Sequence, residues 1–143
     1  MNIAIDFDGT VVEHEYPKIG REIPFAVETL KMLIRDKHNL ILWSCREGEL
    51  LDDAVKWCRK RGIEFYAINR DYPEESRNNN NSYSRKLKVD LFIDDRNVGG
   101  LPEWGVIYQM ISESKTYEQI IRERMGQAEH SRQSGKKHWW SRK

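Results

Sequence analysis

The chain has 143 residues, of which 33% are charged, and a formal net charge of +1; this length is typical of one globular domain. The last 14 residues carry five basic and no acidic side chains, whereas the preceding 129 carry 19 basic and 23 acidic ones. The two cysteines form neither a disulfide framework nor a metal-binding spacing. No apolar run reaches membrane-spanning length, and the amino terminus lacks a secretory signal pattern. These features exclude a membrane-spanning protein and predict a cytoplasmic one.

Apolar runs and helical apolar stripes alternate along the chain. In chain order they predict a strand at 2–6, a helix at 24–37, strands at 40–43 and 63–68 separated by a helix at 49–61, a strand at 91–93, a candidate fifth strand at 106–108 and a helix near 116–125. The strands are apolar throughout rather than at alternate positions, which is typical of a parallel sheet covered on both faces. We therefore expect an α/β fold, a three-layer Rossmann-like parallel sheet of about five strands with helices on both faces.

Polar side chains stand at the carboxyl ends of three predicted strands. These residues are Asp6 with Asp8, Ser44 with Arg46, and Asp94 with Asp95. In a parallel sheet such strand ends lie along one edge, where α/β folds bind their ligands. Two carboxylates one residue apart repel each other unless a cation or a proton intervenes. The pattern predicts a divalent cation, one acid with an altered pKa, or both; the alternative for Asp8-Gly9 alone is a turn.

This order of motifs resembles the haloacid dehalogenase-like (HAD) superfamily of phosphohydrolases. The apolar strand followed by Asp6-Phe7-Asp8-Gly9-Thr10 matches the first motif, and Ser44 after an apolar strand matches the second. The third motif is a lysine, for which Lys86 is the first choice and Lys88 the rival. The paired acids Asp94-Asp95 match the fourth. The resemblance covers residues 3–95, and the same fold would extend to about residue 125.

The resemblance implies a reaction and a role for each motif. Asp6 would attack phosphorus and form an aspartyl-phosphate, while Asp8 would act as general acid and then as general base. Mg²⁺ would bind Asp6, the backbone carbonyl of Asp8, and an acid of the fourth motif, with Asp95 favoured as the direct ligand and Asp94 as its neighbour. The implied phosphate-binding residues are Gly9, Thr10, Ser44 and Lys86.

Some of these residues have a plain structural alternative. Asp94 or Asp95 alone could cap a helix, and Lys86 lies in a basic cluster that could be a solvated surface. Arg46 is a candidate for bidentate contact with the substrate phosphate. A surface ion pair between Arg46 and Glu47 or Glu49 is an equally good interpretation.

Most members of the superfamily carry a cap domain, and this chain has no room for one. The two usual insertion points hold only residues 11–23 and 47–85, and neither can bury a core of its own. We therefore expect a capless hydrolase domain at residues 1–125.

Residues 126–143 are predicted to be a basic, disordered tail, because they contain few aliphatic side chains. The basic and aromatic run Lys136–Trp140 combines charge with stacking surface, so a nucleic-acid partner is a hypothesis beside that of a solvated appendage. The leading function is a Mg²⁺-dependent phosphatase acting on a phosphorylated substrate. The alternatives are a polynucleotide 3′-phosphatase-like enzyme and a non-catalytic HAD-like binding protein; a dehalogenase would have no use for Asp8.

Overall fold

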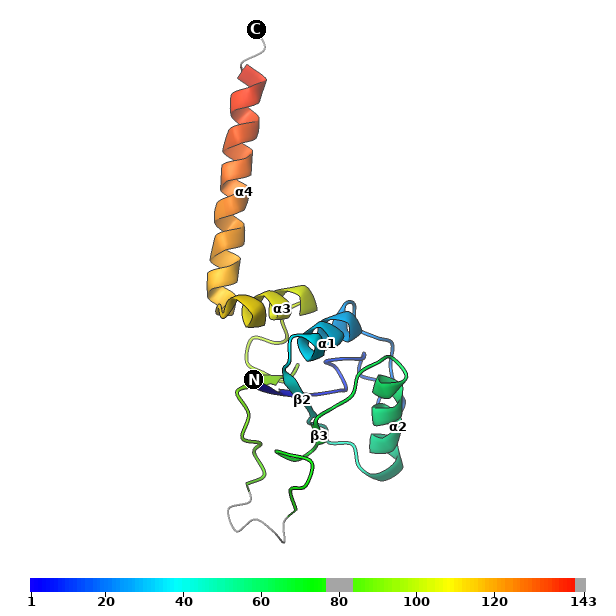
Figure 1. The fold of residues 1–143 in the computed structure, drawn as a ribbon. Coiled ribbons are helices and arrows are strands. Elements are labelled where there is room, and N and C mark those ends of the chain that lie inside the picture. Colours follow the sequence, from blue (N-terminus) through cyan, green and yellow to red (C-terminus); the bar gives the residue numbers. More distant parts are fainter. Residues whose placement is uncertain (77–83, 141–143) are drawn as a thin grey trace. The chain divides into compact units, whose positions relative to one another are not determined.

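The computed structural model describes residues 1–76 and 84–140, with side chains described up to residue 132. Its elements, in chain order, are β1 (Asn2–Ile5), α1 (Ala26–Arg35), β2 (Asn39–Leu42), α2 (Gly48–Arg59), β3 (Ala67–Ile68), β4 (Leu91–Ile93), α3 (Trp104–Glu113) and α4 (Tyr117–Trp140) (Figure 1). The chain divides into two compact units, and the second begins at Gly105.

The described strands form one parallel sheet in the order β3-β2-β1-β4. β1 is therefore central, with β2 on one side and β4 on the other. Ala4 pairs in register with Ile41 of β2 and with Phe92 of β4. The ladder continues past β1, because the Asp6 N–H donates to the Ile93 carbonyl at 3.0 Å. This bond places Asp6 beside Asp94, the residue that follows β4.

The two faces of the sheet are covered in different ways. One face consists of register neighbours, Ala4, Ile41 and Ala67, and it packs against Leu87 of the irregular segment that precedes β4. Alternate strand residues point to the opposite face, where side chains such as Ile5 are fully buried. α1 lies against β2. The core beneath the carboxyl ends of β1 and β2 is therefore closed to solvent.

The α/β class and the parallel sheet are as predicted, but the strand count differs. The described residues form four strands, and the predicted fifth strand at 106–108 is part of α3. Trp104, Ile107 and Ile111 recur at helical spacing, so the same apolar run fits a helix, and a run of three residues cannot distinguish the two. The predicted third strand also shortens, from 63–68 to Ala67–Ile68.

The second unit consists of α3 from Gly105 onward and α4, with their connection. α4 is a continuous 24-residue helix, so the backbone is helical through residue 140 where the sequence pattern predicts disorder. Good helix formers such as Gln127, Ala128 and Glu129 favour this conformation locally, although the segment lacks an aliphatic core. The predicted nucleic-acid contact through Lys136–Trp140 falls outside the described side chains. No helix within the described residues is both long and apolar enough to cross a membrane.

Candidate metal centre and active-site cleft

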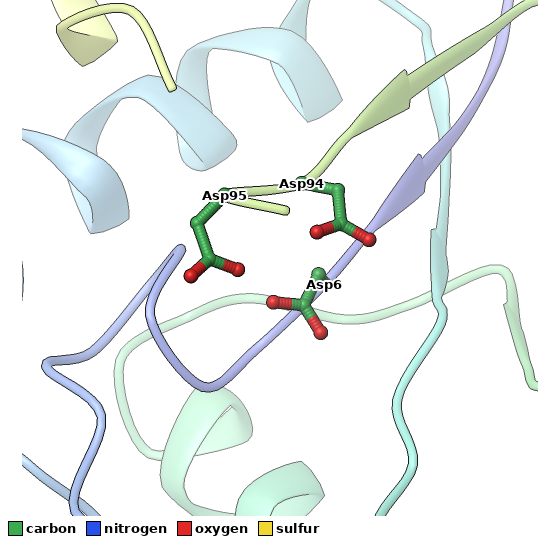
Figure 2. A group of neighbouring side chains, drawn as sticks. All are labelled: Asp6, Asp94 and Asp95. Carbon is green, nitrogen blue, oxygen red and sulfur yellow. The ribbon is translucent and has the colours of Figure 1, made fainter. Parts of the chain in front are cut away.

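Three carboxylates meet where β1 and β4 end. Asp6, Asp94 and Asp95 each offer an oxygen atom, and these atoms all lie within 4.8 Å of one another. All three side chains are half-buried, and Figure 2 shows the carboxylates of Asp94 and Asp95 turned toward that of Asp6. Neither acid of the pair precedes a helix, since the next helix begins at Trp104. The helix-cap interpretation of Asp94 and Asp95 is therefore excluded.

Asp6 occupies an environment that disfavours its charge. The pKa of the Asp6 carboxyl is raised from 3.8 to about 7, chiefly by burial. The hydrogen bond from the Thr10 hydroxyl lowers this pKa, and the nearby Asp94 carboxylate raises it. Desolvation and like charge both penalise a carboxylate. A cation between the three acids would remove both penalties, because it replaces the lost hydration and opposes the repulsion. The donor set is the all-oxygen kind that Mg²⁺ prefers.

Thr10 holds two of these acids together. Its hydroxyl donates to Asp6 Oδ2 at 2.8 Å, lies 3.4 Å from Asp95 Oδ1, and accepts the Asp95 N–H at 3.0 Å. The side chain is fully buried. The buried hydroxyl of Thr10 is thus engaged by the two acids, and the phosphate contact that the resemblance implies for Thr10 stays a prediction.

Gly9 allows the loop to pass close to the acid cluster. Its φ of 90° favours glycine, and a Cβ built on it would collide with the carboxylate of Asp95. Its N–H donates to the Val12 carbonyl at 2.7 Å, so this group closes the turn after Asp8. Gly9 thus gives space to Asp95, and the phosphate contact that the resemblance implies for Gly9 stays a prediction.

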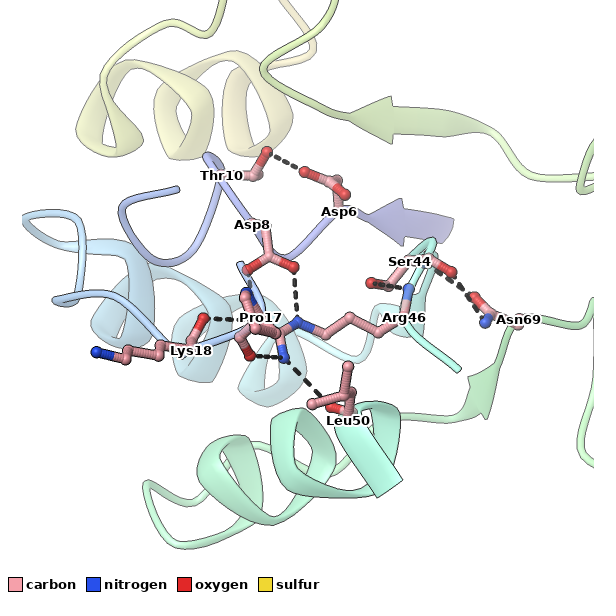
Figure 3. A network of polar contacts seen from close by, with 9 residues as sticks. All are labelled: Asp6, Asp8, Thr10, Pro17, Lys18, Ser44, Arg46, Leu50 and Asn69. Atoms are coloured by element: carbon pink, nitrogen blue, oxygen red, sulfur yellow. Dashed lines mark hydrogen bonds and ion pairs between the residues drawn. The ribbon is translucent and has the colours of Figure 1, made fainter. Parts of the chain in front are cut away.

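Asp8 points to a different partner from Asp6 (Figure 3). Its two carboxylate oxygens accept two N–H groups of Arg46, each at 2.7 Å. The Arg46 side chain is only 1% exposed and that of Asp8 12%. Arg46 therefore forms its ion pair with Asp8 rather than with Glu47 or Glu49. Its fork is occupied by Asp8 in this arrangement, and the contact with a substrate phosphate stays a prediction. The ion pair chiefly accounts for the raised pKa of the Arg46 guanidinium.

Ser44 lies two residues beyond the end of β2. The side chain of Asn69, which follows β3, fixes its backbone: Asn69 Oδ1 accepts the Ser44 N–H at 2.9 Å, and Asn69 Nδ2 donates to the Ser44 carbonyl at 3.0 Å. The Ser44 hydroxyl accepts the Arg46 N–H at 3.1 Å. Within the part of the chain that the structure describes, no acceptor holds the proton of this hydroxyl, so it can donate to a ligand in the cleft.

The lysine of the third motif is not brought into the cleft. Lys86 is exposed, and its Nζ lies 5.6 Å from the centre of the Phe92 ring, two residues before Asp94. Lys88 is exposed as well, and its N–H donates to Asp71 Oδ1 at 2.7 Å. Neither Lys86 nor Lys88 lines the cleft over the strand ends, so the choice between them stays a prediction.

An open cleft of about 510 Å³ lies over the strand ends. Its lining comprises Asp6, Asp8, His14, Tyr16, Trp43, Ser44, Cys45, Arg46, Asp94 and Arg96. The structure thus brings the predicted acids of β1, the serine after β2 and Asp94 to one place. Asp95 contacts Thr10 and does not line the cleft. His14 and Tyr16 come from residues 11–23, a hairpin that we call the flap, in which the Glu13 N–H donates to the Arg21 carbonyl.

Sequence reasoning missed two residues that shape the site. Asn69 stands at the end of the third predicted strand, and its φ of 52° is one that asparagine tolerates, so the strand-end rule could have found it. Trp104 donates its indole N–H to the Thr10 carbonyl at 3.0 Å from a position 94 residues away. Nothing in the local sequence signals that contact.

Comparison with known proteins adds one relative. No family model matches the chain, and no curated protein matches it. Among solved structures, the chain is similar to that of a conserved protein of Bacteroides thetaiotaomicron, with 69% sequence identity and a TM-score of 0.79. The match covers 84% of this chain and 96% of that one. The description of that structure states no activity.

Proposed function

We propose that this chain, which belongs to the same family as the conserved Bacteroides thetaiotaomicron protein, is a Mg²⁺-dependent phosphomonoesterase. It resembles capless members of the HAD superfamily and works through an aspartyl-phosphate at Asp6. The observation that carries the proposal is the group of three half-buried carboxylates at the ends of β1 and β4, beside an open cleft. A carboxyl with a raised pKa, as Asp6 has, beside further acids at a cleft is a mark of functional sites.

The residues present fit a Mg²⁺ ion. Asp6, Asp94 and Asp95 would hold it, with the backbone carbonyl of Asp8, and oxygen ligands of this kind suit a hard divalent cation. When bound, the cation neutralises charge between the attacking carboxylate and the phosphate dianion. Thr10 engages one oxygen of Asp6, at 2.8 Å. The other oxygen is left for the reaction.

Two half-reactions then follow from the side chains. In the first, an oxygen of Asp6 attacks phosphorus while the bond from phosphorus to the ester oxygen breaks, and Asp8 gives that oxygen its proton. In the second, Asp8 takes a proton from water as the water oxygen attacks phosphorus, which releases inorganic phosphate and restores Asp6. The Ser44 hydroxyl lines the cleft and would donate to a phosphoryl oxygen, where positioning and charge stabilisation supply most of the rate.

The open cleft favours a phosphate carried by a large molecule. A cap encloses a small substrate and contacts its leaving group. Here the lining beyond the acids and the loop residues 44–46 consists of the flap side chains His14 and Tyr16 with Trp43 and Arg96. A small ester would touch few of these groups. We expect high KM values for simple phosphate esters and a higher kcat/KM for the physiological substrate.

Turnover by the purified protein tests the proposal. The wild type with Mg²⁺ is assayed against an aryl phosphate, sugar phosphates, nucleotides, phosphopeptides and a 3′-phosphorylated oligonucleotide. Hydrolysis should require Mg²⁺ and disappear in Asp6→Asn. The matched control is Asp90→Asn, because Asp90 is an exposed acid at the opposite end of β4 whose carboxylate accepts the Asn2 N–H at 2.7 Å.

Three results would be decisive in that assay. Selective hydrolysis of the oligonucleotide would assign the enzyme to nucleic-acid ends, which is the alternative raised by the sequence. Mg²⁺ binding without turnover of any ester would support a binding protein and contradict the proposal. Full activity in Asp6→Asn, measured against a mock purification, would contradict it as well.

A further inference from the structure

Arg46 is the most completely engaged charged side chain at the cleft. Its five N–H groups have five acceptors: the two oxygens of Asp8, each at 2.7 Å, and the carbonyls of Lys18, Pro17 and Leu50 at 2.8, 3.1 and 3.4 Å (Figure 3). A guanidinium has five N–H donors and no acceptor. Arg46 therefore has no donor left for a substrate phosphate.

These acceptors come from three separate parts of the chain. Asp8 belongs to the loop after β1, Pro17 and Lys18 to the flap, and Leu50 to α2. Arg46 itself follows β2. The buried guanidinium of Arg46 thus links Asp8 to the flap and to α2.

Two aromatic rings complete the surroundings of the guanidinium. Its central carbon lies 5.4 Å from the centre of the Phe7 ring and 5.3 Å from that of Tyr16. Both distances are within the range of cation–π attraction. Phe7 is fully buried and contacts Trp57 of α2 edge to face. The guanidinium plane is held from several sides, and this arrangement fixes the direction in which it presents its fork to Asp8.

We infer that Arg46 is a positioning residue for the proton transfers of Asp8, an inference that rests on the proposed function. A bidentate Arg–carboxylate pair fixes a carboxyl group in both position and orientation. Misplacement of a proton donor by about 1 Å can cost about 100-fold in rate. Because the same guanidinium binds two flap carbonyls, the acid keeps a constant position relative to the flap side chains beside the leaving group.

The step that depends on Arg46 is protonation of the leaving group. As the Asp6 oxygen–phosphorus bond forms and the phosphorus–ester oxygen bond breaks, the proton of the Asp8 carboxyl passes to the departing oxygen. The products are an alcohol, the aspartyl-phosphate at Asp6 and the Asp8 carboxylate. An alkoxide is a poor leaving group and needs that proton. A nitrophenolate leaves readily without it, so the two ester classes differ in their need for a well-placed Asp8.

The test compares kcat/KM for an alkyl phosphate and for p-nitrophenyl phosphate, since this ratio reports the steps up to formation of the aspartyl-phosphate. Arg46→Met should lower kcat/KM about 100-fold for the alkyl ester and about threefold or less for the aryl ester. Arg46→Lys keeps the charge without the bidentate fork, so we expect partial retention of the alkyl ester activity. If Arg46→Met does not fold, Arg46→Lys carries the same comparison.

The flap offers a matched control. Arg21 also forms a two-bond pair with a carboxylate, that of Glu13 at 3.0 and 3.1 Å, but its side chain is 83% exposed and does not contact Asp8. Arg21→Met should leave both esters unchanged within about twofold, because exposed pairs contribute little. A double-mutant cycle completes the design. In an Asp8→Asn background, Arg46→Met should cause no further leaving-group-dependent loss, because the group that it positions has been removed.

The outcomes separate this inference from the proposed function. If Arg46→Met and Arg46→Lys lower kcat/KM by the same factor for both esters, or if the losses from Asp8→Asn and Arg46→Met are additive on the alkyl ester, the inference is wrong and the proposed function stands. If the wild type hydrolyses no ester with Mg²⁺, the proposed function fails, and the proton-transfer role of Arg46 fails with it.

Discussion

Asp6→Asn should make the Mg²⁺-free protein more stable at alkaline pH, although it removes the proposed nucleophile. Burial, aided by the charge of Asp94, raises the pKa of the Asp6 carboxyl from 3.8 to about 7. The folded state therefore holds this proton more tightly than the unfolded chain does. Protonation of Asp6 therefore stabilises the folded state below about pH 4, and this stabilisation is lost as the pH rises to about 7.

The magnitude follows from the same two values. The difference between 3.8 and about 7 corresponds to at most about 4 kcal/mol in the free energy of unfolding. Asp6 keeps some solvent contact, so we expect about 2 kcal/mol after allowance for screening. An asparagine is close in size and still accepts the Thr10 hydroxyl, but it carries no charge. Asp6→Asn should thus raise the free energy of unfolding by most of this amount at about pH 8 and should leave it unchanged at about pH 4.

Urea unfolding in the presence of EDTA, followed by tryptophan fluorescence at both pH values, measures this difference. Asp90→Asn serves as the control, because its exposed side chain should give the same small change at both pH values. Mg²⁺ should reverse the order at about pH 8 by stabilising the wild type more than Asp6→Asn. If Asp6→Asn is no more stable than the wild type at about pH 8 without metal, the site does not disfavour the charge of Asp6, and this argument for a cation is refuted.

Three further substitutions examine the support of the site. Gly9→Ala should lower the free energy of unfolding in urea titrations by about 2 kcal/mol more than Gly48→Ala does. Both glycines have a positive φ, but only a Cβ at Gly9 would meet the Asp95 carboxylate. Equal losses in the two variants would contradict the close approach of Gly9 to Asp95. Trp104→Phe should cost about 1–3 kcal/mol in the same titrations, since it leaves the Thr10 carbonyl without its indole donor, and a neutral effect would refute that role. Asp95→Asn should weaken Mg²⁺ binding at least about tenfold by calorimetry, and unchanged affinity would remove Asp95 from the ligand set.

The acid cluster could be anticipated because its signals are local. Continuous apolar runs located the ends of β1 and β4, and parallel strands bring their carboxyl ends to one edge. Asp6 and Asp94 were therefore expected at the same edge of the sheet, and the structure shows that β1 and β4 are adjacent strands. The structure adds the ladder bond from Asp6 to Ile93 that sets their spacing.

The partners of the remaining site residues depend on contacts between distant segments. Arg46 and Asp8 are 38 residues apart, and their pairing depends on where the flap returns to the sheet, which no local pattern encodes. Tertiary context also decided Val106–Tyr108, where a short apolar run suits either a strand or a helix. Thr10 and Gly9 were assigned to phosphate through the resemblance, and the structure uses their polar groups to build the loop and hold the acids.

The central claim is that Asp6 becomes phosphorylated during turnover, and chemical trapping tests it most directly. The enzyme is quenched in acid during hydrolysis of p-nitrophenyl phosphate with Mg²⁺, treated with borohydride, which reduces an acyl phosphate to a primary alcohol, and digested with trypsin. We predict that the peptide from Met1 to Lys18 carries a reduced side chain at position 6, as located by fragmentation, and that Asp90→Asn gives the same product. Reduction at Asp8, or an unmodified peptide from an enzyme that is turning over, would contradict the claim.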